Sequence, residues 1–215
     1  MRPLIRLLFA TVLTFLATAA YAQTAPTSGG SAGHKTILVV GDSLSAEYGI
    51  ARGTGWVPLL KRRLAQQYPA WTVVNASISG DTTSGGLTRL PGLLHQQPPS
   101  IVILELGSND ALRGMPLTLT QQNLTTMAQQ AKQAGAAVLL IGMQIPPNYG
   151  RSYADQFRDL FGKVAQAEDT RLVPFFLDGL ATNRELFQGD GLHPNEDGQP
   201  RLLDNVWAQL QPMLK

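Results

Sequence analysis

Four polar clusters spread along this 215-residue sequence carry the residue types that acyl transfer needs. Ser43 follows a β-branched apolar run and lies in a Gly-Asp-Ser turn, while Gly80 and Asn109 belong to later segments of small residues. His193 stands three residues after Asp190, so that one turn of chain can bring the carboxylate to the imidazole. A serine with a histidine base, an orienting carboxylate and nearby N–H donors can attack a carbonyl and hold the oxyanion that forms.

Each of these residues also has a plain structural explanation. Ser43 is a favoured helix N-cap, Gly80 fits an ordinary turn, and Asn109 fits an Asx turn at the end of a strand. Taken singly, these explanations are the stronger ones. The clusters follow predicted strands, however, and loops after parallel strands meet at one edge of the sheet. Their combination therefore favours a catalytic site.

The choice of base rests on where the three histidines fall. His34 lies in a segment without apolar periodicity, and His95 lies on the surface of a predicted helix. His193 lies in a loop after the last predicted strand, on the side of the crevice. We therefore predict that His193 is the base and that Asp190 is its partner.

The elements that must position these residues alternate along the chain. β-Branched apolar runs predict strands, and apolar residues at helical spacing predict helices. Strands and helices that alternate over short joints predict one α/β domain with a parallel sheet and helices on both faces. The polar residues after Ser43 are expected to open a helix. The predicted strands cover 36–40, 71–75, 101–107, 137–143 and 172–176, and the main predicted helices cover about 54–68, 87–94, 119–131, 153–167 and 202–210.

The sequence resembles the SGNH (GDSL) hydrolases, and within them the bacterial periplasmic thioesterase I / protease I / lysophospholipase group, also described as arylesterases. Four blocks carry the resemblance, in the order found in the family. They read Gly-Asp-Ser-Leu-Ser at 41–45, Val-Asn-Ala-Ser-Ile-Ser-Gly-Asp-Thr at 74–82, Glu-Leu-Gly-Ser-Asn-Asp at 105–110 and Asp-Gly-Leu-His-Pro at 190–194. The resemblance implies a flavodoxin-like three-layer α/β/α sandwich with a five-stranded parallel sheet.

The resemblance also assigns roles to single residues. It implies Ser43 as the nucleophile, His193 as the base and Asp190 as its orienting partner. It implies that the Ser43 N–H, the Gly80 N–H and the Asn109 side-chain amide form the oxyanion hole. The activity it implies is hydrolysis of esters and thioesters of acyl chains through an acyl-enzyme, with no metal or other cofactor.

Two positions depart from the pattern common in this group. Ser108 stands where glycine is common and is expected to stiffen the Asn109 loop. Glu47 stands where a small residue is common and is expected to bring a charge to the crevice mouth. Apolar residues in the loops around the crevice suit an acyl chain, although the same residues would also serve to pack the loops. Cleavage of a signal peptide over 1–22 would put cytosolic acyl-CoA out of reach, which favours lysophospholipids or small esters as substrates. The candidate substrate-binding residues are Leu44, Leu112, Ile145, Pro146 and Leu192.

The first 35 residues differ in composition from the rest. A basic start, a short apolar core and an Ala-x-Ala site predict a signal peptide over 1–22 and a periplasmic protein, in preference to an uncleaved anchor. Residues 23–35 read as a flexible tether, where a Gly-x-Ser-x-Gly match at 29–33 is attributed to chance because no strand precedes it. Residues 36–215 form the predicted hydrolase domain, which we expect to be a monomer without a membrane span.

Charge and cysteine content narrow the function classes further. Arg2 and Arg6 account for the formal charge of +2, so the chain after the predicted signal has no net charge. No basic run is left that would favour nucleic acid as a partner. The sequence has no cysteine, which excludes disulfides and a lipid anchor on a cysteine.

Three alternatives remain beside the lipid-directed esterase. A carbohydrate O-acetyl esterase would use the same chemistry, although the apolar loops speak against it. A non-catalytic periplasmic binding module on this fold would not need the set of Ser43, Asp190 and His193. A flavodoxin-like nucleotide-binding protein would favour a Gly-x-Gly-x-x-Gly run after the first strand, and the sequence has none there.

Overall fold

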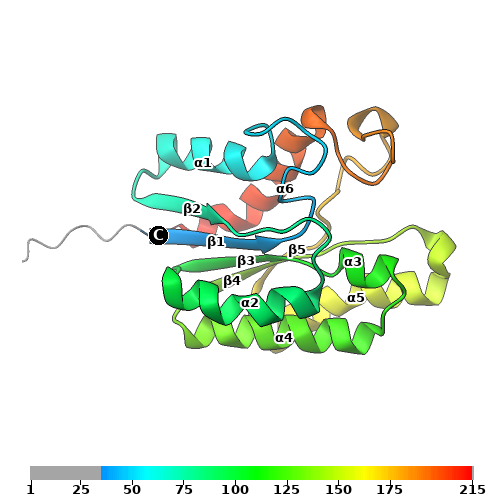
Figure 1. Ribbon diagram of the computed structural model, residues 1–215, viewed down its shortest axis with the longest axis horizontal. Coiled ribbons are helices and arrows are strands. Elements are labelled where there is room, and N and C mark those ends of the chain that lie inside the picture. Colours follow the sequence, from blue (N-terminus) through cyan, green and yellow to red (C-terminus); the bar gives the residue numbers. More distant parts are fainter. Residues whose placement is uncertain (1–34, 215) are drawn as a thin grey trace, which may run out of the picture. The chain divides into compact units, whose positions relative to one another are not determined.

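A parallel β-sheet organises the part of the chain that the computed structural model describes, residues 35–214 (Figure 1). Within these residues it has five strands in the order β2-β1-β3-β4-β5. The strands are β1 (Lys35–Gly41), β2 (Trp71–Asn75), β3 (Ile101–Glu105), β4 (Ala137–Ile141) and β5 (Arg171–Val173). β3 is buried along its whole length and β1 over its last five residues, which explains their nearly continuous apolar sequences.

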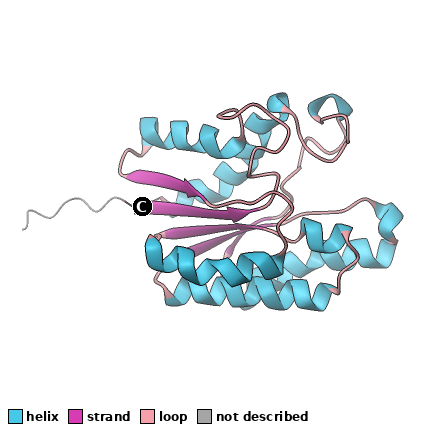
Figure 2. Ribbon diagram, in the orientation of Figure 1, coloured by secondary structure: helices cyan, strands magenta, loops and turns pink. Residues whose placement is uncertain are grey.

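Helices cover both faces of this sheet (Figure 2). α1 (Trp56–Gln67) packs against α6 (Gln199–Leu210) on one face. α2 (Thr83–Gln96), α4 (Leu117–Gln133) and α5 (Arg151–Ala167) pack side by side on the other. The predicted three-layer α/β/α sandwich with a five-stranded parallel sheet is therefore confirmed.

Each long helix buries one stripe of side chains, as its spacing predicts. In α1, Trp56, Leu60 and Leu64 are at most 1% exposed and repeat every four residues. In α5, Phe157 and Phe161 are equally buried, and their rings meet edge to face with centroids 5.2 Å apart. These stripes close the core on either side of the sheet and leave the carboxyl edge of the strands to the loops.

The segment after Ser43 is not the helix that the sequence suggested. It forms consecutive turns, and the first helix begins only at Trp56. Glu47 and Gly49 have φ angles of 59° and 72°, which lie in the left-handed region and interrupt a right-handed helix. Ser43 is thus held by turns at the end of a strand and does not cap a helix.

Other boundaries differ by a few residues. β1 starts one residue earlier than predicted, at Lys35, while β3 and β4 each end two residues earlier. β5 ends at Val173, and Pro174, which cannot donate to a sheet hydrogen bond, follows the strand. A five-residue helix that the sequence analysis missed, α3 (Ser108–Leu112), follows β3. Short 3₁₀ turns cover Pro147–Tyr149, Arg184–Leu186, Glu196–Gly198 and Gln211–Met213.

The predicted signal peptide, 1–22, and all but the last residue of the predicted tether lie outside the described residues. Within residues 35–214, the longest apolar helices fall short of what a transmembrane segment requires.

Candidate active site

Ser43, His193 and Asp190 form one hydrogen-bonded line, although the serine and histidine are 150 residues apart in sequence. His193 Nε2 lies 2.9 Å from Ser43 Oγ, and His193 Nδ1 lies 2.6 Å from Asp190 Oδ2. In the tautomer that carries its proton on Nδ1, the imidazole donates to the carboxylate and turns the Nε2 lone pair toward the serine hydroxyl. This geometry lets the imidazole take the serine proton as Oγ attacks.

The Asp190 carboxylate is fixed by its own loop. Asp190 Oδ1 accepts the backbone N–H groups of Leu192 and His193 at 2.9 and 3.1 Å. Partial desolvation raises the pKa of Asp190, but these two hydrogen bonds and the imidazole outweigh it and lower the pKa to about 2. The carboxylate is therefore ionised at neutral pH and can stabilise a protonated imidazole.

The two ends of the loop that carries His193 are joined by backbone contacts. Phe187 and Pro194 form an isolated antiparallel bridge, and the Gln188 N–H donates to the His193 carbonyl at 2.8 Å. Tyr48 packs against the imidazole, with its ring centroid 4.7 Å from that of His193. Sequence reasoning missed Tyr48, since nothing in its position predicts a contact with a ring 145 residues away.

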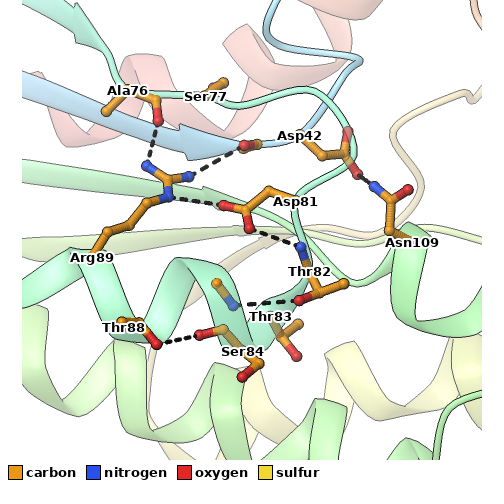
Figure 3. Close-up of polar contacts among 12 residues, drawn as sticks. Asp42, Ala76, Ser77, Asp81, Thr82, Thr83, Ser84, Thr88, Arg89 and Asn109 are labelled. Atoms are coloured by element: carbon orange, nitrogen blue, oxygen red, sulfur yellow. Dashed lines mark hydrogen bonds and ion pairs between the residues drawn. The ribbon is translucent and has the colours of Figure 1, made fainter.

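The predicted oxyanion donors follow the carboxyl ends of three strands, β1, β2 and β3. Within residues 35–214, neither the Ser43 N–H nor the Gly80 N–H has an acceptor. Asn109 lies in the first turn of α3, and its Nδ2 donates to Asp42 Oδ2 at 3.1 Å, which leaves the second amide hydrogen available (Figure 3). Gly80 lies on the loop after β2 and is not among the residues that line the cavity described below.

Gly80 occupies the third position of a tight turn. The Asp81 N–H donates to the Ile78 carbonyl at 3.1 Å, and the φ angle of Gly80 is 79°. This combination fits a type II turn, in which the third residue needs a positive φ and is usually glycine. The turn leaves the Gly80 N–H exposed and free of a side chain.

Two buried carboxyl groups lie directly behind Ser43. Asp42 accepts the Leu44 N–H at Oδ1 and the Asn109 amide at Oδ2, and burial raises the pKa of Asp42 to about 6. Glu105, at the end of β3, accepts the Asp42 N–H at 3.3 Å and the Ser45 hydroxyl at 2.6 Å. Burial, and then the charge of Asp42, raise the pKa of Glu105 well above its ordinary value.

A cavity of about 440 Å³ opens beside Ser43 and His193. All five residues proposed from the sequence to bind substrate line it. Further apolar side chains complete its wall, and Ser108, Asn109 and Gln144 add polar groups. The lining includes Leu44, Leu112, Met143, Ile145, Pro146, Phe175, Leu177, Phe187 and Leu192.

Ser108 and Glu47, the two positions that depart from the family pattern, have different surroundings. Ser108 begins α3 and lines the cavity. Glu47 does not line this cavity, but it borders a much smaller pocket together with Ser43 and His193, so the expected charge at the crevice mouth stays a prediction. Its Oε1 accepts the N–H groups of Gly53 and Gly55, both at 2.8 Å. Its carboxylate thus holds the loop that leads into α1.

Asp110 has a structural role next to the site. Its carboxylate accepts the Thr83 N–H at 2.9 Å and the Thr83 hydroxyl at 2.5 Å, tying the start of α2 to α3. No cluster of three or more histidine, aspartate or glutamate side chains suited to a metal ion occurs among residues 35–214.

Comparison with known proteins identifies the family. Residues 39–201 match the model of the GDSL-like lipase/acylhydrolase family. The chain belongs to this family. As a member of the GDSL (SGNH) family it is an ester-hydrolysing enzyme, and the resemblance found in its four sequence blocks is confirmed.

Similar proteins are known from Pseudomonas aeruginosa and Escherichia coli. The chain is 54% identical to the esterase TesA of Pseudomonas aeruginosa over 180 residues, which cover 84% of this chain and 90% of that protein. It is 41% identical to the thioesterase 1/protease 1/lysophospholipase L1 of Escherichia coli K12, covering 96% and 91% of the two chains. A crystal structure of a TesA superposes with a TM-score of 0.81 at 54% identity, covering 83% of this chain and 99% of that one.

Proposed function

We propose that this GDSL-family protein is a serine esterase that cleaves acyl esters and thioesters through an acyl-enzyme on Ser43. The observation that carries the proposal is the line from Ser43 Oγ through the His193 imidazole to Asp190, beside an apolar cavity. The complete line favours an enzyme over a non-catalytic binding module on the same fold.

The reaction follows from this geometry. Ser43 Oγ attacks the carbonyl carbon while its proton passes to His193 Nε2, and Asp190 stabilises the imidazolium. The negative charge that forms on the carbonyl oxygen is held by the Ser43 N–H, the Gly80 N–H and the Asn109 amide. Collapse breaks the bond to the leaving alcohol or thiol, which takes the proton from His193. Water then attacks the acyl-enzyme by the same route and releases the acid.

The lining of the cavity supports acyl chains as the substrate class. Leu44, Leu112, Ile145, Pro146 and Leu192 are proposed to contact the chain, since burial of apolar surface favours binding by about 25 cal/mol per Å². The names of the P. aeruginosa and E. coli relatives, an esterase and a thioesterase/lysophospholipase, support the same class. Lysophospholipids and small esters are the proposed natural substrates.

The proposed place of action is the periplasm. The predicted signal peptide over 1–22 supports it, and a periplasmic enzyme would meet lysophospholipids but not cytosolic acyl-CoA. Mass spectrometry of the exported protein tests this step, because cleavage after Ala22 predicts a mature chain that begins at Gln23. Size-exclusion chromatography with light scattering tests the proposed monomer.

The activity itself is tested with p-nitrophenyl esters from acetyl to palmitoyl, comparing the wild type with Ser43→Ala. Ser108→Ala serves as a matched control, because it removes a hydroxyl that lines the same cavity but lies outside the proposed proton-transfer line. We expect Ser43→Ala to abolish hydrolysis, Ser108→Ala to retain it, and the wild type to prefer medium or long chains. A sharp acetyl preference would instead indicate the carbohydrate O-acetyl esterase, and equal rates in the wild type and Ser43→Ala would overturn the proposed mechanism.

A further inference from the structure

One arginine of α2 joins the two loops that carry the backbone donors of the proposed oxyanion hole. Arg89 reaches from the middle of α2 toward the carboxyl edge of the sheet (Figure 3). Its Nε donates to Asp81 Oδ2 at 2.8 Å, its Nη1 donates to the Ala76 carbonyl, and its Nη2 donates to the Gly41 carbonyl at 3.4 Å. All three nitrogens of the guanidinium are therefore used.

The three acceptors of Arg89 lie close in sequence to Ser43 and Gly80. Gly41 ends β1, two residues before Ser43, while Ala76 and Asp81 begin and end the loop that contains Gly80. A single guanidinium thus contacts the last residue of β1 at one point and the loop after β2 at two. Only the planar fork of an arginine can satisfy three acceptors arranged in this way.

The site of Arg89 is shielded from water. The side chains of Arg89 and Asp81 are only 19% and 12% exposed, unlike most surface ion pairs. Asp81 is itself held at Oδ1 by the Thr82 N–H, and Gly85 leaves it the space it needs, because a Cβ there would overlap the carboxylate. Removal of Arg89 would leave the Asp81 carboxylate and the Ala76 carbonyl without their main partner.

We propose that Arg89 is a positioning residue, which sets the Gly80 N–H relative to the Ser43 N–H by fastening the β2 loop to the end of β1. The inference rests on the proposed function, because it presumes that these two N–H groups hold the oxyanion. Donors stabilise the developing charge from hydrogen-bond distance, about 2.7–3.1 Å, and must be held within about 0.5 Å of the productive position. Loosening the loop should therefore weaken binding of the transition state more than binding of the ester.

Arg113 makes a weaker contact with the same loop and serves as an internal comparison. Its Nη2 donates to the Gly80 carbonyl at 2.9 Å, but the Arg113 side chain is exposed to solvent. A single exposed hydrogen bond contributes little to the order of a loop. Arg113→Ala is therefore expected to change kcat less than a substitution at Arg89.

The test compares Arg89→Ala, Arg89→Lys and the wild type on the p-nitrophenyl ester that the wild type prefers. Arg63→Ala is the matched control, since Arg63 also pairs with an aspartate, Asp204 at 3.0 Å, but this pair joins α1 to α6 on the opposite face of the sheet from α2. The measurements are kcat, KM, the thermal midpoint, and the affinity for a boronic acid that forms a tetrahedral adduct with the serine. Methylguanidinium is added to Arg89→Ala to refill the vacated space.

We expect Arg89→Ala to lower kcat by about tenfold or more with KM nearly unchanged, and to weaken the boronate adduct by a similar factor. Methylguanidinium should restore part of the rate, and Arg63→Ala should keep the wild-type kcat. If Arg89→Ala does not fold, Arg89→Lys decides, because it keeps the charge but reaches fewer acceptors and should show a smaller loss of the same pattern.

A folded Arg89 variant with wild-type kcat and adduct affinity would overturn the inference. So would a loss of kcat with an unchanged adduct, since that pattern indicates a general structural role. Either result leaves the proposed function intact as long as Ser43→Ala is inactive. A fully active Ser43→Ala would instead overturn the proposed function itself.

Discussion

The two sides of the candidate site are built in different ways. The base side, Asp190 and His193, lies within four residues of one loop and is held by hydrogen bonds inside that loop. The side that holds Ser43 and the oxyanion donors draws on loops after three strands and is fixed by buried groups such as Asp42 and Glu105. The difference suggests a general point. A partly exposed loop of a few residues is enough to place a general base, whereas an oxyanion hole needs donors from several segments that are held rigidly by buried contacts.

The largest effect should come from the base side. His193→Ala removes the acceptor for the Ser43 proton, and we expect kcat to fall by about 10⁴-fold or more while the fold stays intact. Because the loop is held mainly by its own backbone and Asp190, the thermal midpoint should change little. A folded His193→Ala protein that keeps most of its rate would show that the chain uses a different base.

The next effect tests the framework side. Asn109→Ala removes the amide donor, and we expect kcat to fall by about a hundredfold with KM nearly unchanged. Asn205→Ala is a suitable control, because its amide also bridges loop oxygens, the Phe176 and Asp178 carbonyls, but far from Ser43. An unchanged kcat in Asn109→Ala would remove this amide from the oxyanion hole.

The pH dependence of stability should have opposite directions for Asp42, on the framework side, and Asp190, on the base side. The folded-state pKa of Asp42 is raised by burial from 3.8 to about 6, so between these values the folded protein binds more protons than the unfolded chain. Its contribution to stability is therefore lost as pH rises from about 4 to about 6. The pKa of Asp190 is lowered to about 2, so its contribution is lost as pH falls from about 4 to about 2.

Urea unfolding midpoints measured across this pH range check the assignment. Asp42→Asn should remove the decline between pH values of about 4 and 6, whereas Asp190→Asn should leave that decline in place and affect only the acid limb. A pH profile that Asp42→Asn leaves unchanged would show that another group, with Glu105 the first candidate, titrates in that window.

The smallest effect is expected outside both sides. His95 lies exposed in the last turn of α2, at the opposite end of that helix from the site, as the sequence predicted. His95→Ala should therefore leave kcat within about twofold of the wild type, since surface substitutions away from special features are usually small in effect. A large loss of kcat in a folded His95→Ala protein would indicate that His95, and not His193, is the base.

Sequence patterns predicted the strands and long helices well, but they predicted poorly the short segments that hold the site residues in place. The buried strands were predictable because runs such as 101–105 are continuously apolar, and the spacing of Asp190 and His193 predicted a contact that one turn of chain can make. The short helix α3 was missed because five residues carry too little periodicity. The turns after Ser43 were missed because the left-handed conformation of Glu47 depends on its bonds to Gly53 and Gly55.

The contacts of Arg89 show the same limit from another direction. In the sequence Arg89 is one polar residue on a helix, and its three acceptors lie 8, 13 and 48 residues away. Periodicity identifies which face of a helix is buried, but it does not say which loop carbonyls lie above that face. Such contacts become visible only once the strands have been placed side by side.

The closed loop from Phe187 to Pro194 has a consequence for engineering chain-length preference. The same loop holds the base and contributes Gly191 and Leu192 to the cavity wall, so a substitution there that reshapes the wall also disturbs His193. Leu112 ends α3 and Ile145 lies in the loop after β4, and neither makes a hydrogen bond to the base. Substitutions that alter the preferred acyl-chain length without loss of activity should therefore be found around these two positions, and rarely in the loop that carries His193.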